Sequence, residues 1–362
     1  MVYWSFLEFG IHLSNDDAWV PMLAEPAVAI KLVSAGMSQV FAVLLKAFFG
    51  GYSAFDISTG GLQLEGPHGD KVRIWAVLSM TLQDGAAQKA VWGCKGDGGS
   101  KHCMLCRNLY SGSSGIAASD ATHMLVDDMV GDSIEFSTNA DIMGVIDRLK
   151  HHKATCSIGD FKLREQACGF SLQEHGLLSD AFLKRHLRPA DQFCHDWMHG
   201  VMANGVFHVT LLKVIEMFRG VAPSAWSNLA EYTNRYTWPA QTFFQPGAAD
   251  MFSDDKVKAY RKAGHVKCTA SQALAIYPVI AAYVRHVVMK VPGVCAHACQ
   301  AYLHLTDLLD ALVVVPHGLT TSESLRSTVR SLMQACKHVR NLCHARVAHI
   351  RATTRFSMRM AA

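Results

Sequence analysis

Charge is scarce in this sequence. Charged residues make up 18% of 362 residues and the formal net charge is +4, so the chain as a whole offers little attraction for polyanions. Any affinity for nucleic acid must therefore come from local patches. Hydrophobic residues reach 50%, which supplies a core and excludes a largely disordered chain, and the length exceeds the roughly 100–200 residues of one domain.

The sequence also lacks an uninterrupted apolar run of about 20 residues, the length that spans a membrane. Lys46 interrupts 36–50, and Pro278 and Arg285 interrupt 272–292. Met1 is not followed by a basic stretch, an apolar core and a small-residue cleavage site. We therefore expect a soluble intracellular protein without membrane contact, in the nucleus or the cytoplasm.

Several catalytic motifs are missing. The sequence contains no G-x-x-x-x-G-K-[ST] loop, no H-E-x-x-H helix and no G-x-S-x-G turn. It also lacks the H-x-E motif that a zinc deaminase requires. The glycine-rich stretch from Gly93 to Gly99 lacks the strand–turn–helix context of a dinucleotide site. The common nucleotide-binding, metalloprotease and hydrolase classes therefore find little support.

Hydrophobic periodicity predicts a hairpin among helices. Segments 53–66 and 70–84 have strand character and flank a Gly-Pro-His-Gly turn, which predicts a hairpin that ends at Asp84. A short helix is expected to follow over 85–93. Longer helices are predicted at 27–50, 139–152, 195–218, 225–236, 253–263, 270–290, 294–314 and 321–340.

Cysteine supplies the most distinctive motif. The eleven cysteines are an odd, scattered set, which favours a reducing compartment with thiols that are free or metal-bound. Cys103 and Cys106 follow a glycine-rich loop at the C-x-x-C spacing of a structural zinc site. His199 is the best third ligand. Candidates for the fourth are Asp196, Cys194, His195 and, as a local substitute, His102.

Asp196 and His199 are three residues apart, so on a helix they would share one face. If Asp196 is not a ligand, it can serve as the acid that favours a helix N-terminus. A second cluster, Cys295-Ala-His297-Ala-Cys299, also resembles a metal site, but a lone cluster on an apolar helix is more often buried thiol packing, which is the interpretation we favour.

Taken together, these motifs resemble the eukaryotic cut-and-paste transposases of the CACTA kind. In that family an aspartate near the end of a ribonuclease-H-like strand precedes a glycine-containing loop and a C-x-x-C pair, and a D-x-x-H pair opens a helical insertion. The matching stretches are 82–108 and 193–200. The resemblance implies that Asp84 is the second acid of a DDE triad. It also implies that the C-x-x-C pair is Cys103 and Cys106, and the D-x-x-H pair Asp196 and His199.

Such enzymes cleave and transfer DNA strands with two magnesium ions about 4 Å apart, held by carboxylates. The resemblance places the first acid upstream of segment 3–10 and the third after the helical insertion, where acidic residues are missing beyond Glu323. Asp56 is a substitute for the first acid, and Glu231 or Glu323 for the third. We therefore expect a truncated, catalytically incomplete copy that holds structural zinc, and magnesium only if it is active.

The expected fold is α+β and predominantly α, with a remnant ribonuclease-H-like sheet and a large helical insertion. The expected domains are a partial core at 1–155, a helical insertion at 156–335 and a basic tail at 336–362. DNA is the expected partner. The alternatives are a non-catalytic, zinc-stapled nucleic-acid-binding or interaction module, or a decayed fragment without function.

Overall fold

A computed structural model describes most of the chain and divides it into two compact units, Met1–Asp196 and Trp197–Ala362. The described residues are 1–52, 55–112, 114–116, 123–126, 134–203, 205–238, 248–315 and 318–339. The protein is α+β and mostly helical, as predicted, and its described strands form small sheets. The expected domain boundary between residues 155 and 156 falls inside the first unit, between the helices at 139–155 and 158–168, which contact each other. Most of the expected basic tail lies outside the described residues.

The first unit combines short strands with helices. Its strands are β1 (Val2–Trp4), β2 (Val20–Leu23), β3 (Leu62–Glu65), β4 (Lys71–Ile74), β5 (Thr81–Gln83), β6 (Leu109–Tyr110), β7 (Met124–Leu125) and β8 (Phe193–His195). Its α-helices are α1 (Ala27–Ile30), α2 (Gly36–Phe48), α3 (Gly85–Trp92), α4 (Asn139–Thr155), α5 (Ile158–Cys168) and α6 (Pro189–Gln192). The strands form four separate two-stranded sheets within the described residues, and no larger sheet.

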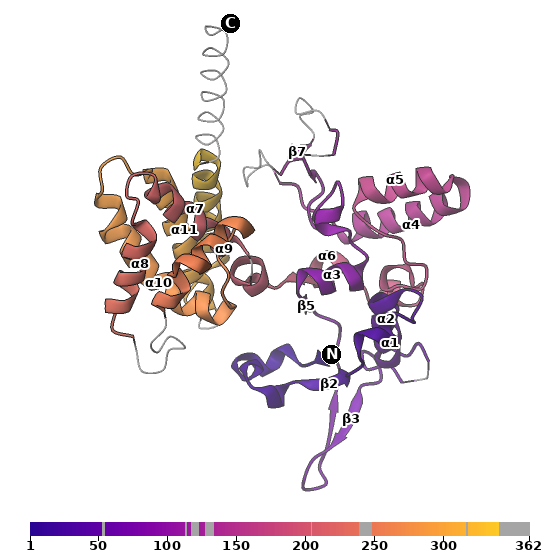
Figure 1. The fold of residues 1–362 in the computed structure, drawn as a ribbon. Coiled ribbons are helices and arrows are strands. Elements are labelled where there is room, and N and C mark those ends of the chain that lie inside the picture. The colour runs from indigo at the N-terminus through magenta and orange to yellow at the C-terminus, as the bar shows by residue number, and fades with distance from the viewer. Residues whose placement is uncertain are drawn as a thin grey trace, which may run out of the picture. The chain divides into compact units, whose positions relative to one another are not determined.

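The core of the first unit lies where α3 and α4 meet the segment 170–187. Figure 1 shows α4 and α5 side by side, and the two helices contact each other. Thr138 caps the N-terminus of α4: its hydroxyl accepts from the Asp141 amide, while the Asp141 carboxylate accepts from the Thr138 amide. Ile142, Ile146 and Leu149 on its apolar face are at most 3% exposed. The predicted helix at 139–152 is thus confirmed, and it runs three residues further.

Two predictions about the first unit need correction. The hairpin exists, since β3 pairs antiparallel with β4, but it ends at Ile74 and the strand before Asp84 pairs elsewhere. The predicted helix at 27–50 is broken into α1 and α2 by a turn. Gly36, where this turn meets α2, has a φ of 52°. A residue with positive φ interrupts a right-handed helix, and periodicity alone does not reveal it.

In the described part of the second unit, all of the regular secondary structure is helical. A π-helical turn, η7 (Met198–Met202), precedes α7 (Val206–Arg219), α8 (Ala225–Arg235), α9 (Asp254–Ala263), α10 (Ala270–His286) and α11 (Ala296–Val314), and residues 322–339 are also helical. The helices predicted from residue 225 onward are therefore confirmed. The one predicted at 195–218 is wrong at its start, because His195 ends a strand and α7 begins at Val206.

Glu216 joins three of these helices at the edge of their shared core. Its carboxylate accepts from the indole of Trp226 on α8 at 2.6 Å, from Arg261 on α9 at 2.8 Å and from Arg219 on α7 at 2.9 Å. Burial raises the pKa of Glu216, but these donors outweigh it and lower the pKa overall. The carboxylate therefore stays charged and ties the three helices together.

Two helical segments, Met198–Arg219 and Ala270–Lys290, are long and apolar enough to cross a membrane by length and composition. About half of each apolar window is buried inside the protein, 47% and 50% respectively. Ile276, Ile280 and Val284 on the second segment are fully buried in the core of the second unit. Core packing therefore accounts for this apolar character, and the two segments are weak evidence for membrane insertion.

Candidate functional site at a parallel strand pair

Strands β5 and β8 lie next to each other in parallel, although about 110 residues separate them in the sequence. Thr81 faces Phe193, Leu82 faces Cys194 and Gln83 faces His195. Asp84 follows the last residue of β5, and Asp196 follows the last residue of β8. Because the strands are parallel and in register, both aspartates leave the same edge of the pair, at the carboxyl ends of the strands.

Side chains from α3 and α6 fix this pairing. The Gln88 amide on α3 donates to the carbonyl of Cys194 at 2.8 Å. The Thr81 hydroxyl donates to the carbonyl of Gln192 and accepts from the indole of Trp92, each at 3.2 Å. Trp92 is 1% exposed. The short strands are therefore held by buried polar contacts in addition to their own backbone hydrogen bonds.

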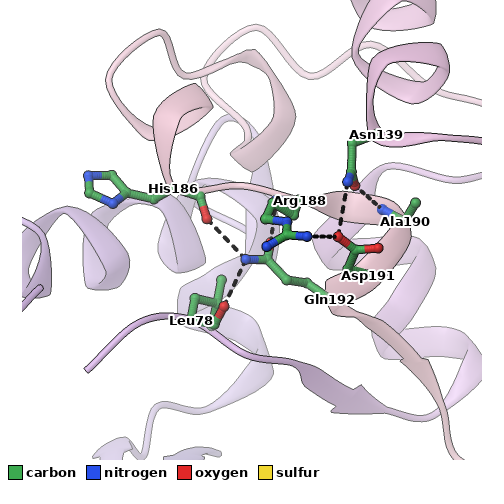
Figure 2. A network of polar contacts seen from close by, with 7 residues as sticks. All are labelled: Leu78, Asn139, His186, Arg188, Ala190, Asp191 and Gln192. Atoms are coloured by element: carbon green, nitrogen blue, oxygen red, sulfur yellow. Dashed lines mark hydrogen bonds and ion pairs between the residues drawn. The ribbon is translucent and has the colours of Figure 1, made fainter. Parts of the chain in front are cut away.

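Gln192 is the residue immediately before β8, and it is 2% exposed. Figure 2 shows its amide nitrogen between two backbone carbonyls, that of Leu78 at 2.9 Å and that of His186 at 3.0 Å. Its amide oxygen accepts from the backbone amide of Arg188 at 2.7 Å. This one side chain joins the segment before β5 to the segment before β8.

Asp84 has a structural task as well as its predicted catalytic one. Its carboxylate accepts from the Ala87 amide at 2.7 Å and caps the N-terminus of α3. The helix ends at Gly93 with a φ of 68°. The predicted helix at 85–93 is confirmed, and the capping contact fixes the direction of the Asp84 side chain.

The C-x-x-C loop reaches the end of β8. The Cys103 sulfur lies 3.9 Å from Nε2 of His195, the last residue of the strand. Cys106 is 9% exposed, and its backbone amide donates to the carbonyl of Cys103 at 3.3 Å. His195, which the sequence offered as one of several fourth ligands, is therefore the residue of the 194–199 run that the structure brings to the cysteine pair.

The two thiols differ in their protonation. A hydrogen bond with Cys106 lowers the pKa of Cys103 against the opposing effect of burial, and His195 adds to the lowering. The same hydrogen bond, together with burial, raises the pKa of Cys106. Of the two thiols, Cys103 is therefore the one that loses its proton more readily, and the thiolate is the form that binds a metal.

Cys94 and Lys101 belong to this neighbourhood and were missed in the sequence. Burial raises the pKa of Cys94 to about 11, and the charge of Cys103 adds to the effect. Burial lowers the pKa of Lys101, while nearby thiols, including those of Cys106 and Cys103, oppose that shift. The sequence did not point to Cys94, because its separation from the C-x-x-C pair is not a standard spacing of metal ligands.

The geometry fits zinc in part. Zn–S and Zn–N bonds at a tetrahedral angle place sulfur and nitrogen about 3.6 Å apart. The Cys103–His195 separation of 3.9 Å is close to that value. Across the described residues, however, no group of three or more His, Cys, Asp or Glu side chains has metal-binding geometry. Two donors are in place, and a complete set requires the Cys106 sulfur and a fourth ligand to turn toward them.

The contacts of the other predicted residues are as follows. His102 contacts the carbonyl of Gly96 at 3.2 Å. Asp196 precedes the turn that contains His199, and the two fall on opposite sides of the boundary between the units. Asp56 accepts from the amide and hydroxyl of Ser58 at 2.8 and 2.6 Å, in a local turn.

The two substitutes for the third acid, Glu231 and Glu323, belong to the second unit. Glu231 is on α8 and forms an ion pair with Arg235, and Glu323 is exposed in the helix 322–339.

Comparisons with protein-family models, with curated proteins and with solved structures found no match to this chain.

Proposed function

We propose that this chain is a transposase-derived, zinc-stapled domain that binds DNA inside the cell, in the nucleus or the cytoplasm, and that lacks a complete catalytic site. The observation that carries the proposal is the parallel β5–β8 pair, which puts Asp84 and Asp196 at one strand edge with the C-x-x-C loop beside it. Adjacent parallel strands that end in carboxylates are the arrangement expected of a ribonuclease-H-like core. The four small sheets would then be its remnant.

Catalytic incompleteness follows from the number of acids at that edge. Two-metal phosphoryl transfer needs carboxylates enough to hold two magnesium ions about 4 Å apart. In addition, one carboxylate oxygen of Asp84 accepts the hydrogen bond that caps α3. The remaining candidates lie in a turn at Asp56 or in the second unit. Two aspartates would hold one magnesium ion weakly, and that is insufficient for strand transfer.

Zinc would have a structural role in this domain. Cys103, Cys106 and His195 are the residues that would hold it, with Cys94 or Asp196 as the fourth ligand. Bound zinc would supply a cross-link and no reaction chemistry. It would tie the loop after α3 to the end of β8, and so fix the register of the parallel pair.

Zinc content tests the staple. The purified protein, Cys103→Ser, His195→Ala and His199→Ala are compared by elemental analysis and thermal unfolding. We expect stoichiometric zinc in the wild type and a loss of zinc and stability in Cys103→Ser and His195→Ala. Retention of zinc by His195→Ala and its loss from His199→Ala would show that the family-like ligand set is the correct one. A wild type without zinc would refute the staple.

DNA binding and cleavage are tested separately. We expect DNA affinity that falls steeply with salt, because Lys and Arg contacts to phosphate release counterions, and no nicking with magnesium or manganese. Asp84→Asn is the matched variant, because asparagine caps a helix as well as aspartate does. Nicking by the wild type that Asp84→Asn abolishes would refute catalytic incompleteness. Absence of salt-sensitive DNA binding would refute the nucleic-acid role.

A further inference from the structure

A groove of about 290 Å³ lies between α4 and α5 in the first unit. Its lining residues are Val145, Arg148, Leu149 and His152 on α4, and Arg164, Ala167 and Cys168 on α5. Sites for small molecules range upward from roughly 300 Å³. The groove therefore has room for a small molecule of about the size of a nucleotide, and the strand-edge site described above uses none of its lining residues.

The two helices that form the groove are fixed by local contacts. Residues 156 and 157 alone separate them. Thr138 caps α4, and the hydroxyl of Ser157 caps α5 by accepting from the Asp160 amide at 3.1 Å. Leu149, at the floor of the groove, is 2% exposed and belongs to the core of the first unit. The walls are thus in place before a ligand binds.

The groove carries positive charge that no carboxylate neutralises. Arg148 and Arg164 are exposed, and neither forms an ion pair with Asp or Glu in the described part of the chain. Two neighbouring carboxylates on the same helices, those of Asp147 and Glu165, pair at 2.7 and 3.8 Å with lysines outside the groove. None of the lining residues is acidic. Two guanidinium groups are therefore available for an anion.

His152 holds one of these arginines in place. Its Nε2 accepts from Nη1 of Arg164 at 3.4 Å, so its proton is on Nδ1, which lies 3.8 Å from the Cys156 sulfur. Partial burial lowers the pKa of His152, and the positive charges of Arg164, His151 and Arg148 lower it further. The imidazole thus stays neutral near pH 7 and acts as an acceptor that positions Arg164.

We propose that this groove binds a phosphate monoester carried on a small, partly apolar molecule of nucleotide size. A monoester has a charge of about −1.5 to −2 at neutral pH, which two unpaired guanidinium groups match better than they match a singly charged carboxylate or phosphodiester. The planar guanidinium group binds phosphate oxygens in pairs. Val145, Leu149 and Ala167 offer apolar surface to the rest of the molecule. The inference does not depend on the function proposed above.

Calorimetric titration of the full chain tests the site. The ligands are deoxythymidine monophosphate and deoxythymidine, and we expect the nucleoside to bind at least about tenfold more weakly than its monophosphate. Arg148→Gln and Arg164→Gln should each weaken binding of the monophosphate at least about tenfold. Lys162→Gln is the matched control, because Lys162 is exposed on α5 and does not line the groove. It removes the same charge and should leave the affinity unchanged.

Two variants that keep the positive charge separate a built site from general electrostatic attraction. Arg164→Lys retains the charge but loses the planar fork, so it should also weaken binding. Ala167→Phe fills the groove and should abolish binding, and since Ala167 is exposed the protein should still fold. Circular dichroism checks the folding of every variant. No binding of the monophosphate by the wild type, or equal affinity in the wild type and the folded arginine variants, would overturn the proposal.

The monoester can come from a free nucleotide or from the phosphorylated end of a DNA strand. An oligonucleotide with and without a terminal phosphate distinguishes these sources. Tighter binding of the phosphorylated strand, lost in Ala167→Phe, would assign the groove to a DNA end, whereas binding of deoxythymidine monophosphate alone would assign it to a free nucleotide. Equal binding of the two strands without binding of the monophosphate would overturn the monoester site, and would leave DNA binding by the chain as a whole intact.

Discussion

Gln192 provides the sharpest test of the link between the two strands of the candidate site. Gln192→Leu keeps the size of the side chain and removes all three of its hydrogen bonds, to the carbonyls of Leu78 and His186 and from the amide of Arg188. Each of these partly buried backbone groups is then left without a partner, at about 1 kcal/mol each, so the expected loss is about 3 kcal/mol. The cost should fall on the first unit, where all of the partners lie.

Denaturant unfolding and hydrogen exchange measure this effect. Gln192→Leu should lower the midpoint of the transition that reports on the first unit, and should speed amide exchange in β5 and β8. Gln63→Leu is the control, because Gln63 is exposed and makes one long contact of 3.4 Å with Arg73. We expect a change of no more than about 0.5 kcal/mol there. A loss below about 1 kcal/mol in Gln192→Leu, or unchanged exchange in both strands, would refute the assigned role.

Three further predictions follow from polar contacts and backbone geometry. Burial raises the pKa of Asp180, but the ion pair with Lys46 at 2.8 Å and two backbone amides outweigh this effect and lower the pKa below its ordinary value. Its stabilisation is therefore present above the ordinary pKa and lost as pH falls through the lowered value. Asp180→Asn should cost about 1–2 kcal/mol at pH 7, and urea titrations should show the difference vanishing in acid; a constant difference would contradict this. Glu216→Gln should destabilise the second unit by about 1–2 kcal/mol. Thermal unfolding tests this prediction, and an unchanged unfolding midpoint would contradict it. Gly93→Ala should cost roughly 2 kcal/mol or more, because φ is 68° and a Cβ would lie 2.9 Å from the carbonyl oxygen of Ser171; an equally stable variant by denaturant titration would refute it.

The local pattern of the sequence determined most of the helices. Helix α4 follows from a capping threonine and apolar residues at helical spacing, and these interactions lie within a few residues of each other. The hairpin of β3 and β4 follows equally from its turn. The end of that hairpin could not be predicted, because the run from Lys71 to Gln83 reads as one strand while its two ends pair with different partners.

The candidate site was only partly visible in the sequence. The C-x-x-C spacing predicted Cys103 and Cys106 as a ligand pair, and that prediction depends on the spacing of two neighbouring residues alone. The choice of His195 over His199 depends instead on where β8 ends, and the predicted helix over 195–218 concealed that end. Periodicity cannot distinguish a three-residue strand from the first turn of a helix, because both present one or two apolar residues.

By itself, then, the sequence determined the helical character of the chain, the capping of its elements and the nature of its metal-like residues. The tertiary structure alone decided which of those residues meet. Asp84 and Asp196 share one strand edge because β5 and β8 pair across about 110 residues, and Cys103 meets His195 because the C-x-x-C loop reaches the end of β8. Such contacts depend on burial of surfaces from distant segments, and no local spacing encodes them.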